Sequence, residues 1–203
     1  MALLICLVGL PGSGKTTFCR RLLALLPPSS ARHVSQDELK TRVKCERLAA
    51  ETLKGGGVAL IDRTNVSEEQ RRHWLDIAGE AGAPVDVVRF EVGLEELVRR
   101  CDARENHPNI KPGQGRRIIN MMKGKRQELS GAEREKIREV RVVRDEASME
   151  AAVGYFLDVL LPGEGGAGAG AGKKRKGGGG GEEEGDKKGD KKGRSRDDPI
   201  CLD

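Results

Sequence analysis

The first sixteen residues constrain the fold more than any other part of the chain. Leu3–Val8 form a continuous apolar run of strand length, and Gly9-Leu-Pro-Gly-Ser-Gly-Lys-Thr16 follows directly. An unbroken apolar run is typical of a central parallel strand that is covered on both faces. The glycine-rich stretch fits the pattern G-x-x-x-x-G-K-[ST] in its usual context, after a buried strand and before a helix. This opening predicts an α/β domain with a phosphate-binding loop.

The composition of this loop indicates how phosphate would be bound. Glycines allow successive backbone N–H groups to turn inward around phosphate oxygens, and the following helix N-terminus adds a favourable dipole. We expect Lys15 to supply charge to the β- and γ-phosphates of ATP, and the Thr16 hydroxyl to reach Mg²⁺. The residues predicted to contact the nucleotide are Gly9, Pro11, Gly12, Ser13, Gly14, Lys15, Thr16 and Thr17.

Strand and helix patterns alternate along the rest of the chain up to residue 162. This alternation predicts a P-loop NTPase or kinase fold of the α/β class, with a parallel sheet covered by helices on both faces. The predicted strands are Leu3–Val8, Arg32–Ser35, Val58–Ile61, Pro84–Phe90 and Glu139–Val143. The predicted helices are Lys15–Leu26, Gln36–Lys54, one capped by Ser67, Leu94–Arg104, Arg117–Gln127 and Met149–Leu160. A Pro/Gly loop is expected between 106 and 115.

The chain divides into residues 1–162, a kinase-like domain, and residues 163–203, a low-complexity Gly/Lys/Glu tail. The tail holds 14 of the 28 glycines and almost no large apolar side chain, so we expect it to be disordered. The net charge of +5 is compatible with a polyanionic partner without requiring one. The five cysteines form no C-x-x-C pair, which indicates reduced thiols in an intracellular protein. The apolar run at the start is too short to span a membrane, and we expect the chain to have no membrane partner.

Two acidic residues follow predicted strands. Asp37 comes just after the second strand, and Asp62 ends the third strand ahead of Arg63-Thr-Asn65. Ligands of open parallel sheets bind beyond the carboxyl ends of the strands, so both carboxylates would face the phosphate loop. Asp37 could take the proton from an attacking hydroxyl, or only cap a helix. Asp62 has the position of the magnesium-side acid of phosphate-loop enzymes. The abrupt change from apolar to polar residues favours a site there over a cap.

Basic residues on two predicted helices suggest a lid and a groove. Arg99, Arg100 and Arg104 lie beside the Pro/Gly loop, where a lid could close over the transferring phosphate, although a solvated basic face has the same pattern. A second basic set would either line an acceptor groove or form a solvated helix face. It comprises Arg116, Arg117, Lys123, Lys125 and Arg126.

Residues 3–126 resemble the kinase domain of the polynucleotide 5′-hydroxyl kinases. The resemblance is carried by the GLPGSGKTT loop, His33–Asp37, the stretch IDRTNVSEEQRRHWLDIA from Ile61, and Leu94–Arg104. It implies that Lys15 and Thr16 hold ATP and Mg²⁺, that Asp37 activates the acceptor 5′-hydroxyl, and that Arg104 contacts the donor phosphates. It also implies an acceptor site with Asp62, ordered by Arg63 and Asn65. Lys40 stands where phage-type enzymes have an arginine, and a lysine loses the bidentate contact to an acceptor phosphate.

The resemblance leads to a hypothesis of phosphoryl transfer to the 5′-OH of DNA or RNA, with nucleic acid ends as partners and a role in DNA repair. A kinase for a small metabolite or a modified tRNA shares the loop and the sheet, and a non-catalytic nucleotide-binding adaptor shares the loop. In the tail, Lys173–Lys176 matches a nuclear localisation signal, with the cytoplasm as the other location. Residues 197–203 match a SUMO-interacting segment.

Overall fold

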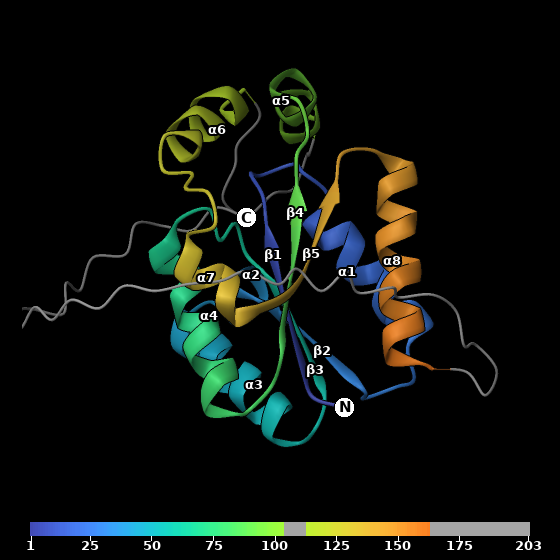
Figure 1. The fold of residues 1–203 in the computed structure, drawn as a ribbon. Coiled ribbons are helices and arrows are strands. Elements are labelled where there is room, and N and C mark those ends of the chain that lie inside the picture. Colours follow the sequence, from blue (N-terminus) through green and yellow to red (C-terminus); the bar gives the residue numbers. More distant parts are fainter. Residues whose placement is uncertain (104–112, 163–203) are drawn as a thin grey trace, which may run out of the picture. The chain divides into compact units, whose positions relative to one another are not determined.

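The structure of the protein is a computed structural model that describes residues 1–103 and 113–162. Five parallel strands form one sheet in the order β2-β3-β1-β4-β5 (Figure 1). The strands are β1 (Leu3–Val8), β2 (Ala31–Ser35), β3 (Val58–Asp62), β4 (Val85–Phe90) and β5 (Ile137–Val143). The described helices are α1 (Lys15–Leu25), α2 (Gln36–Leu39), α3 (Arg42–Lys54), α4 (Glu68–Glu80), α5 (Leu94–Asp102), α6 (Gly115–Lys123), α7 (Gly131–Lys136) and α8 (Glu146–Leu160). The predicted α/β class and parallel sheet are confirmed.

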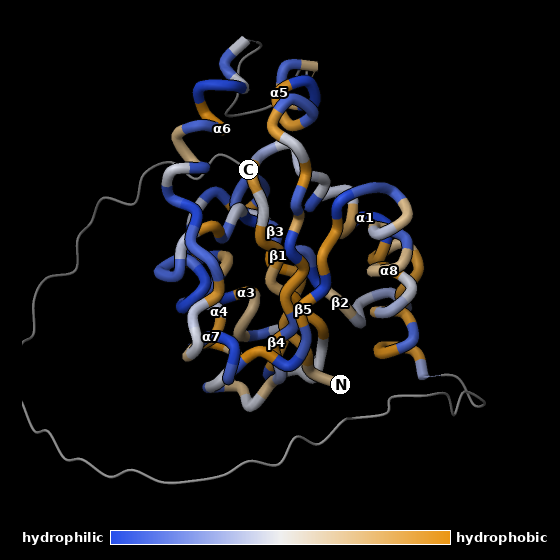
Figure 2. The backbone as a smooth tube through the Cα atoms, turned by 45° about the horizontal axis from the view of Figure 1, so that its top comes forward, coloured by the Kyte–Doolittle hydropathy of each residue, from blue (hydrophilic) through white to orange (hydrophobic). Residues whose placement is uncertain are grey.

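Two apolar clusters hold helices against the two faces of the sheet. On one face, α1 and α8 pack through Phe18 and Phe156, whose rings meet edge to face at 5.8 Å. On the other face, α3 and α4 pack through Cys45 and Trp74. The central strand β1 is apolar along its whole length and fully buried, and the strands at the centre of the sheet carry most of the hydrophobic colour in Figure 2. Each buried large side chain contributes about 1.5–3 kcal/mol relative to its exposed state, so these clusters supply the main stabilisation of the sheet.

A third apolar cluster joins α5 and α6 beside the carboxyl ends of the strands. It is formed by Leu10, Val66, Leu97, Cys101, Ile118, Ile119 and Met122. Leu10 belongs to the predicted phosphate loop and Val66 to the segment after β3, so this helix pair packs directly on both. The helix pair therefore lies beside the phosphate loop (Figure 1), and its role as a lid stays a prediction.

The predicted helix from Gln36 to Lys54 is wrong in one respect, because the chain leaves the helical conformation at Lys40. Lys40 has a φ of 69°, in the left-handed region, and caps the short α2. Thr41 then starts α3, where its hydroxyl accepts a hydrogen bond from the Lys44 amide at 3.3 Å. The break separates the turn that carries Asp37 from the long helix that covers the sheet.

The left-handed backbone at Lys40 predicts an unusual order of stability. We expect Lys40→Gly to be more stable than Lys40→Ala by about 1 kcal/mol, because an L-residue pays about 1–2 kcal/mol in this conformation and glycine does not. At Lys44, inside α3, the order should reverse by about 1 kcal/mol, because glycine is the poorer helix former. Urea unfolding of the four variants measures both differences. The same order at both positions would contradict the role of Lys40 as a helix stop.

The boundaries of the other elements differ less from the predicted ones. The helix predicted at Arg117–Gln127 is α6 and ends at Lys123, and α7 was not predicted. Four cysteines in the described ranges are buried and form no disulfide there, namely Cys6, Cys19, Cys45 and Cys101. Within the same ranges, no helix is long and apolar enough to cross a membrane. The predictions for Arg104, the tail of residues 163–203, Lys173–Lys176 and residues 197–203 lie outside the described residues.

Candidate active site

The loop between β1 and α1 has the geometry of a phosphate cradle. Gly12 and Gly14 have φ values of 79° and 101°, which glycine adopts far more readily than other residues. At Gly12 the space is also closed, since a Cβ would lie 2.9 Å from the Leu97 carbonyl oxygen of α5. Side chains of the described residues do not cap the N-terminus of α1. The first N–H groups of this helix are therefore available to an anion.

Two polar groups of the loop are placed for phosphate binding. The ammonium group of Lys15 is buried and donates to the carbonyl oxygens of Gly9 at 3.0 Å and Leu10 at 3.2 Å. The Ser13 hydroxyl is also buried, and its oxygen has no hydrogen-bond partner among the described residues. A buried hydroxyl without a partner is costly, and a phosphate oxygen would supply that partner. The donor set thus fits the triphosphate predicted for this loop.

Asp62 lies at the carboxyl end of β3 and is 2% exposed. Its Oδ2 atom is 2.8 Å from Nε2 of His33, and its Oδ1 atom has no partner at hydrogen-bond geometry among the described residues. Burial acts to raise the pKa of Asp62, but the bond to His33 and the charge of Lys15 outweigh it and hold the pKa below its usual value. Thr16 acts in the same direction without reaching bonding geometry with Oδ1. Asp62 is therefore an ionised carboxylate beside the phosphate loop, and it does not cap a helix.

Asp37 lies in the first turn of α2, at the same edge of the sheet as Asp62. Ser35, the last residue of β2, pairs in register with Asp62, and Asp37 follows two residues later. Ser35 occupies the N-cap position of α2, so the capping alternative for Asp37 is excluded. The side chain of Asp37 is partly exposed. The structure thus brings both predicted carboxylates to the edge that carries the phosphate loop.

The segment after Asp62 is ordered by buried contacts. The Asn65 amide donates to the Leu7 carbonyl at 2.8 Å, and its oxygen accepts from Trp74 Nε1 at 2.9 Å. The guanidinium of Arg63 lies 5.8 Å from the centre of the Trp74 ring. Both residues are buried, and these contacts fit the ordering role that the family resemblance implies for them. Direct contact of Arg63, Asn65 or Lys40 with a substrate stays a prediction.

A buried ion pair that was not predicted from the sequence also contacts the segment that follows Asp62. Arg71 of α4 binds both carboxylate oxygens of Glu133 in α7, at 2.7 and 2.8 Å. Its guanidinium also donates to the carbonyl oxygens of Asn65 and Val66, at 3.2 and 3.1 Å. It donates to Gln127 and Glu128 as well. Arg71 therefore connects the segment that follows Asp62 to the segment that follows α6.

Three basic residues of α5 and α6 are engaged with acids. Arg99 and Arg100 both bind Glu96, and Arg100 also lies 3.5 Å from the Gly12 carbonyl oxygen. Arg116 pairs with Glu95. Arg100 is thus the member of this set that the described residues place against the phosphate loop. The lid role of Arg104 and the acceptor-groove role of the residues on and after α6 stay predictions.

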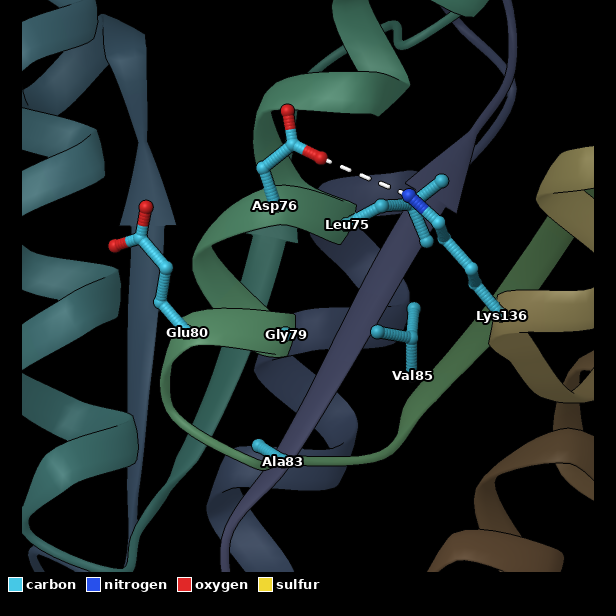
Figure 3. A pocket seen from close by; sticks show the side chains of 7 residues that line it. All are labelled: Leu75, Asp76, Gly79, Glu80, Ala83, Val85 and Lys136. Carbon is cyan, nitrogen blue, oxygen red and sulfur yellow. Dashed lines mark ion pairs between the residues drawn. The ribbon is translucent and has the colours of Figure 1, made fainter.

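A separate hollow of about 570 Å³ lies elsewhere, between α4, the start of β4 and the end of α7 (Figure 3). Its floor is apolar, with Leu75, Ala83 and Val85, and Asp76 faces Lys136 across it at 3.8 Å. It contains none of the predicted site residues. The predicted site residues that the structure describes lie instead at the opposite edge of the sheet, where the strands have their carboxyl ends.

The fold and the loop together define a nucleotide-binding P-loop domain of the α/β class. Residues 4–129, more than half of the chain, match the protein family described as "AAA domain", and the chain belongs to that family.

Curated relatives give a finer comparison. The chain is 38% identical over 109 residues to the "Bifunctional polynucleotide phosphatase/kinase" of Schizosaccharomyces pombe, covering 53% of this chain and 26% of the relative. It is 28% identical over 125 residues to "Transcription factor bHLH140" of Arabidopsis thaliana, covering 59% of this chain and 14% of the relative. The chain thus spans about a quarter or less of the length of these relatives. The predicted resemblance to polynucleotide kinases is confirmed.

Two solved structures share the fold. A "Fungal RNA Kinase" superposes with a TM-score of 0.61 at 18% identity, covering 79% of this chain and 85% of that one. Kti12 of Chaetomium thermophilum, in complex with ADP-AlF3, gives a TM-score of 0.53 at 20% identity, covering 77% and 98%. At these identities the likeness supports the fold alone, and it agrees with the predicted P-loop kinase architecture.

Proposed function

We propose that this chain is an ATP-dependent kinase that transfers the γ-phosphoryl group to the 5′-hydroxyl of DNA or RNA. The observation that carries the proposal is the placement of two carboxylates, Asp37 and Asp62, at the sheet edge that also carries Lys15. A protein that only binds nucleotide needs the loop but not the pair of acids. The name of the S. pombe relative and that of the fungal structure support a polynucleotide as the acceptor.

The residues divide the work of phosphoryl transfer between a donor side and an acceptor side. The loop amides and Lys15 would hold the β- and γ-phosphates of ATP, and Thr16 would hold Mg²⁺, which neutralises charge on the phosphates when bound. On the acceptor side, Asp37 would accept the proton of the attacking hydroxyl. Asp62 would orient the acceptor within the site. Most of the acceleration then comes from positioning and charge stabilisation.

The test is a transfer assay with ATP labelled at the γ-phosphate. We expect label to appear on 5′-OH oligonucleotides of DNA or RNA and not on 5′-phosphorylated strands of the same sequence. Small alcohols and tRNA serve as competing acceptors in parallel reactions. Transfer to those acceptors alone would indicate the metabolite or tRNA kinase instead, and ATP binding without transfer to any acceptor would indicate the adaptor.

Lys15→Ala should lower kcat by at least about 10²-fold, because the transition state loses a buried charge-bearing donor. Lys54→Ala is the matched control, since Lys54 is exposed at the end of α3, far along the chain from the loop. Its kcat should stay within twofold of wild type. Equal rates for Lys15→Ala and wild type would remove the phosphate loop from the reaction.

We also propose an intracellular, nuclear location and a role in DNA repair. The support is the basic run Lys173–Lys176 and the polynucleotide acceptor proposed above. Microscopy of the full chain with and without residues 173–176 tests the location. The SUMO-type contact of residues 197–203 rests on the sequence pattern alone.

A further inference from the structure

A histidine to which the proposed reaction assigns no role links the two acidic elements of the site. His33 lies in β2, and its ring is mostly buried. Nε2 is 2.8 Å from Asp62 Oδ2 at the end of β3, and Nδ1 is 3.2 Å from Glu38 Oε1 in α2. One imidazole therefore bridges two carboxylates that belong to different elements.

The surroundings of the ring favour its doubly protonated form. Burial acts to lower the pKa of His33, but the bonds to Asp62 and Glu38 and the charges of both acids raise it above its usual value. Other ionisable groups of this site include Lys15, whose charge acts to lower the pKa of Asp62, and the Cys19 thiol, whose pKa burial raises. Charges then alternate from Lys15 through Asp62 and His33 to Glu38. Each neighbour stabilises the next.

This arrangement has a consequence for each end of the bridge. At Asp62, the bond engages Oδ2, and Oδ1 is left as the oxygen with no described partner. At Glu38, the bond holds α2 against the strand ends one residue after Asp37. The helix α2 spans only four residues and contains no buried residue, although Leu39 packs partly against the apolar cluster of α3 and α4. The bridge thus ties the turn that carries Asp37 to Asp62.

We propose that His33 is a positioning residue of the phosphoryl-transfer site: its imidazole ring holds Asp62 and, through Glu38, the turn that carries Asp37. The proposal rests on the proposed function for its kinetic part. Its structural part stands by itself, because the bridge is present whether or not the acceptor is a polynucleotide.

The kinetic test compares His33→Leu with His33→Gln, whose amide can still donate one hydrogen bond to Asp62. We expect His33→Leu to lower kcat about 10-fold to 100-fold with unchanged affinity for ATP, since a displacement of about 1 Å costs about 10²-fold. His33→Gln should recover a large part of this loss. Arg32→Gln, an exposed neighbour on the same strand, is the matched control and should stay within twofold of wild type.

A double-mutant cycle tests the bridge itself. Glu38→Gln should lower kcat less than His33→Leu does, and combining the two should add little, because residues in one network are not additive. Full additivity, or a wild-type kcat for His33→Leu, would overturn the proposal. A loss of ATP affinity together with kcat in His33→Leu would also overturn it, because that pattern indicates general damage to the fold.

Nuclear magnetic resonance separates failure of this proposal from failure of the proposed function. In wild type the Nε2 proton of His33 should give the signal of a hydrogen-bonded imidazole N–H, as its distance of 2.8 Å to Asp62 Oδ2 implies, and Asp62→Leu should abolish this signature. If oligonucleotides are not phosphorylated but the signature is present, the proposed function fails and the bridge stands. If wild type gives no hydrogen-bonded Nε2–H signal, the bridge fails, whatever the acceptor.

Discussion

Asp37→Asn should lower kcat by about 10² to 10⁴-fold while the affinity for ATP stays within twofold of wild type. Asparagine keeps the size and polarity of the side chain but cannot take a proton, and general-base catalysis contributes about that factor. Asp37 belongs to α2, which lies apart in sequence from the loop that holds the nucleotide. The chemical step should therefore be lost without loss of ATP binding.

Single-turnover transfer to a 5′-OH oligonucleotide measures the chemical step, and calorimetry measures ATP binding. Asp158→Asn in α8 makes the same chemical change at an exposed position and should transfer phosphate at the wild-type rate. Normal turnover by the Asp37→Asn protein would refute the general-base assignment. Parallel loss of ATP binding would place Asp37 on the donor side instead.

The parts of the fold that the sequence predicted are those encoded within a few neighbouring residues. The apolar run Leu3–Val8 and the glycine loop after it predicted β1 and the phosphate cradle, because backbone conformation and burial there depend on local composition. The predicted cap of Ser67 at the start of α4 is equally local, and the structure contains it, with Gln70 completing a capping box. Such signals do not require knowledge of which strands are neighbours.

The parts that the sequence did not predict depend on contacts between distant residues. His33 meets Asp62 only because β2 and β3 are adjacent in the sheet, and no spacing within 29 residues of sequence indicates that pair. Arg71 and Glu133 are 62 residues apart. Each alone looks like a solvated helix residue, since charged side chains are seldom fully buried. The helix stop at Lys40 was missed for another reason, because lysine does not normally signal a left-handed residue.

Glu133→Gln should have the largest effect on stability, lowering the free energy of unfolding by about 3–5 kcal/mol. Glutamine keeps the shape but not the charge, so the buried guanidinium of Arg71 loses its counterion, and breaking one side of a buried pair costs about this amount. Replacing both residues with leucine would not restore stability, because the carbonyl oxygens of Asn65 and Val66 would lose their donor. The strand end at Asp62 would loosen as well.

The dependence of stability on pH gives this prediction a second readout. Burial acts to raise the pKa of Glu133, but the bonds from Arg71 and the Ser130 amide hold it below its usual value. A carboxylate with a lowered pKa in the folded state contributes stability that is complete above its unfolded pKa, about 4.3, and is lost as the pH falls. Part of the acid destabilisation of wild type should therefore be absent in Glu133→Gln.

Urea unfolding between about pH 2 and pH 8 measures both effects, because the acid response of Glu133 lies below its unfolded pKa, and Glu135→Gln on the same helix is the control. Glu135 is exposed, so its variant should stay within about 0.5 kcal/mol of wild type and keep the full acid response. A loss below about 1 kcal/mol in Glu133→Gln would contradict the role of the pair, because water or the introduced amide would then satisfy Arg71. A large loss with an unchanged acid response would assign the effect to the cap of α7, which Glu133 also forms with Ser130. The expected result, loss of stability together with loss of the acid response, would identify the Arg71–Glu133 ion pair as a main contributor to the stability of the fold.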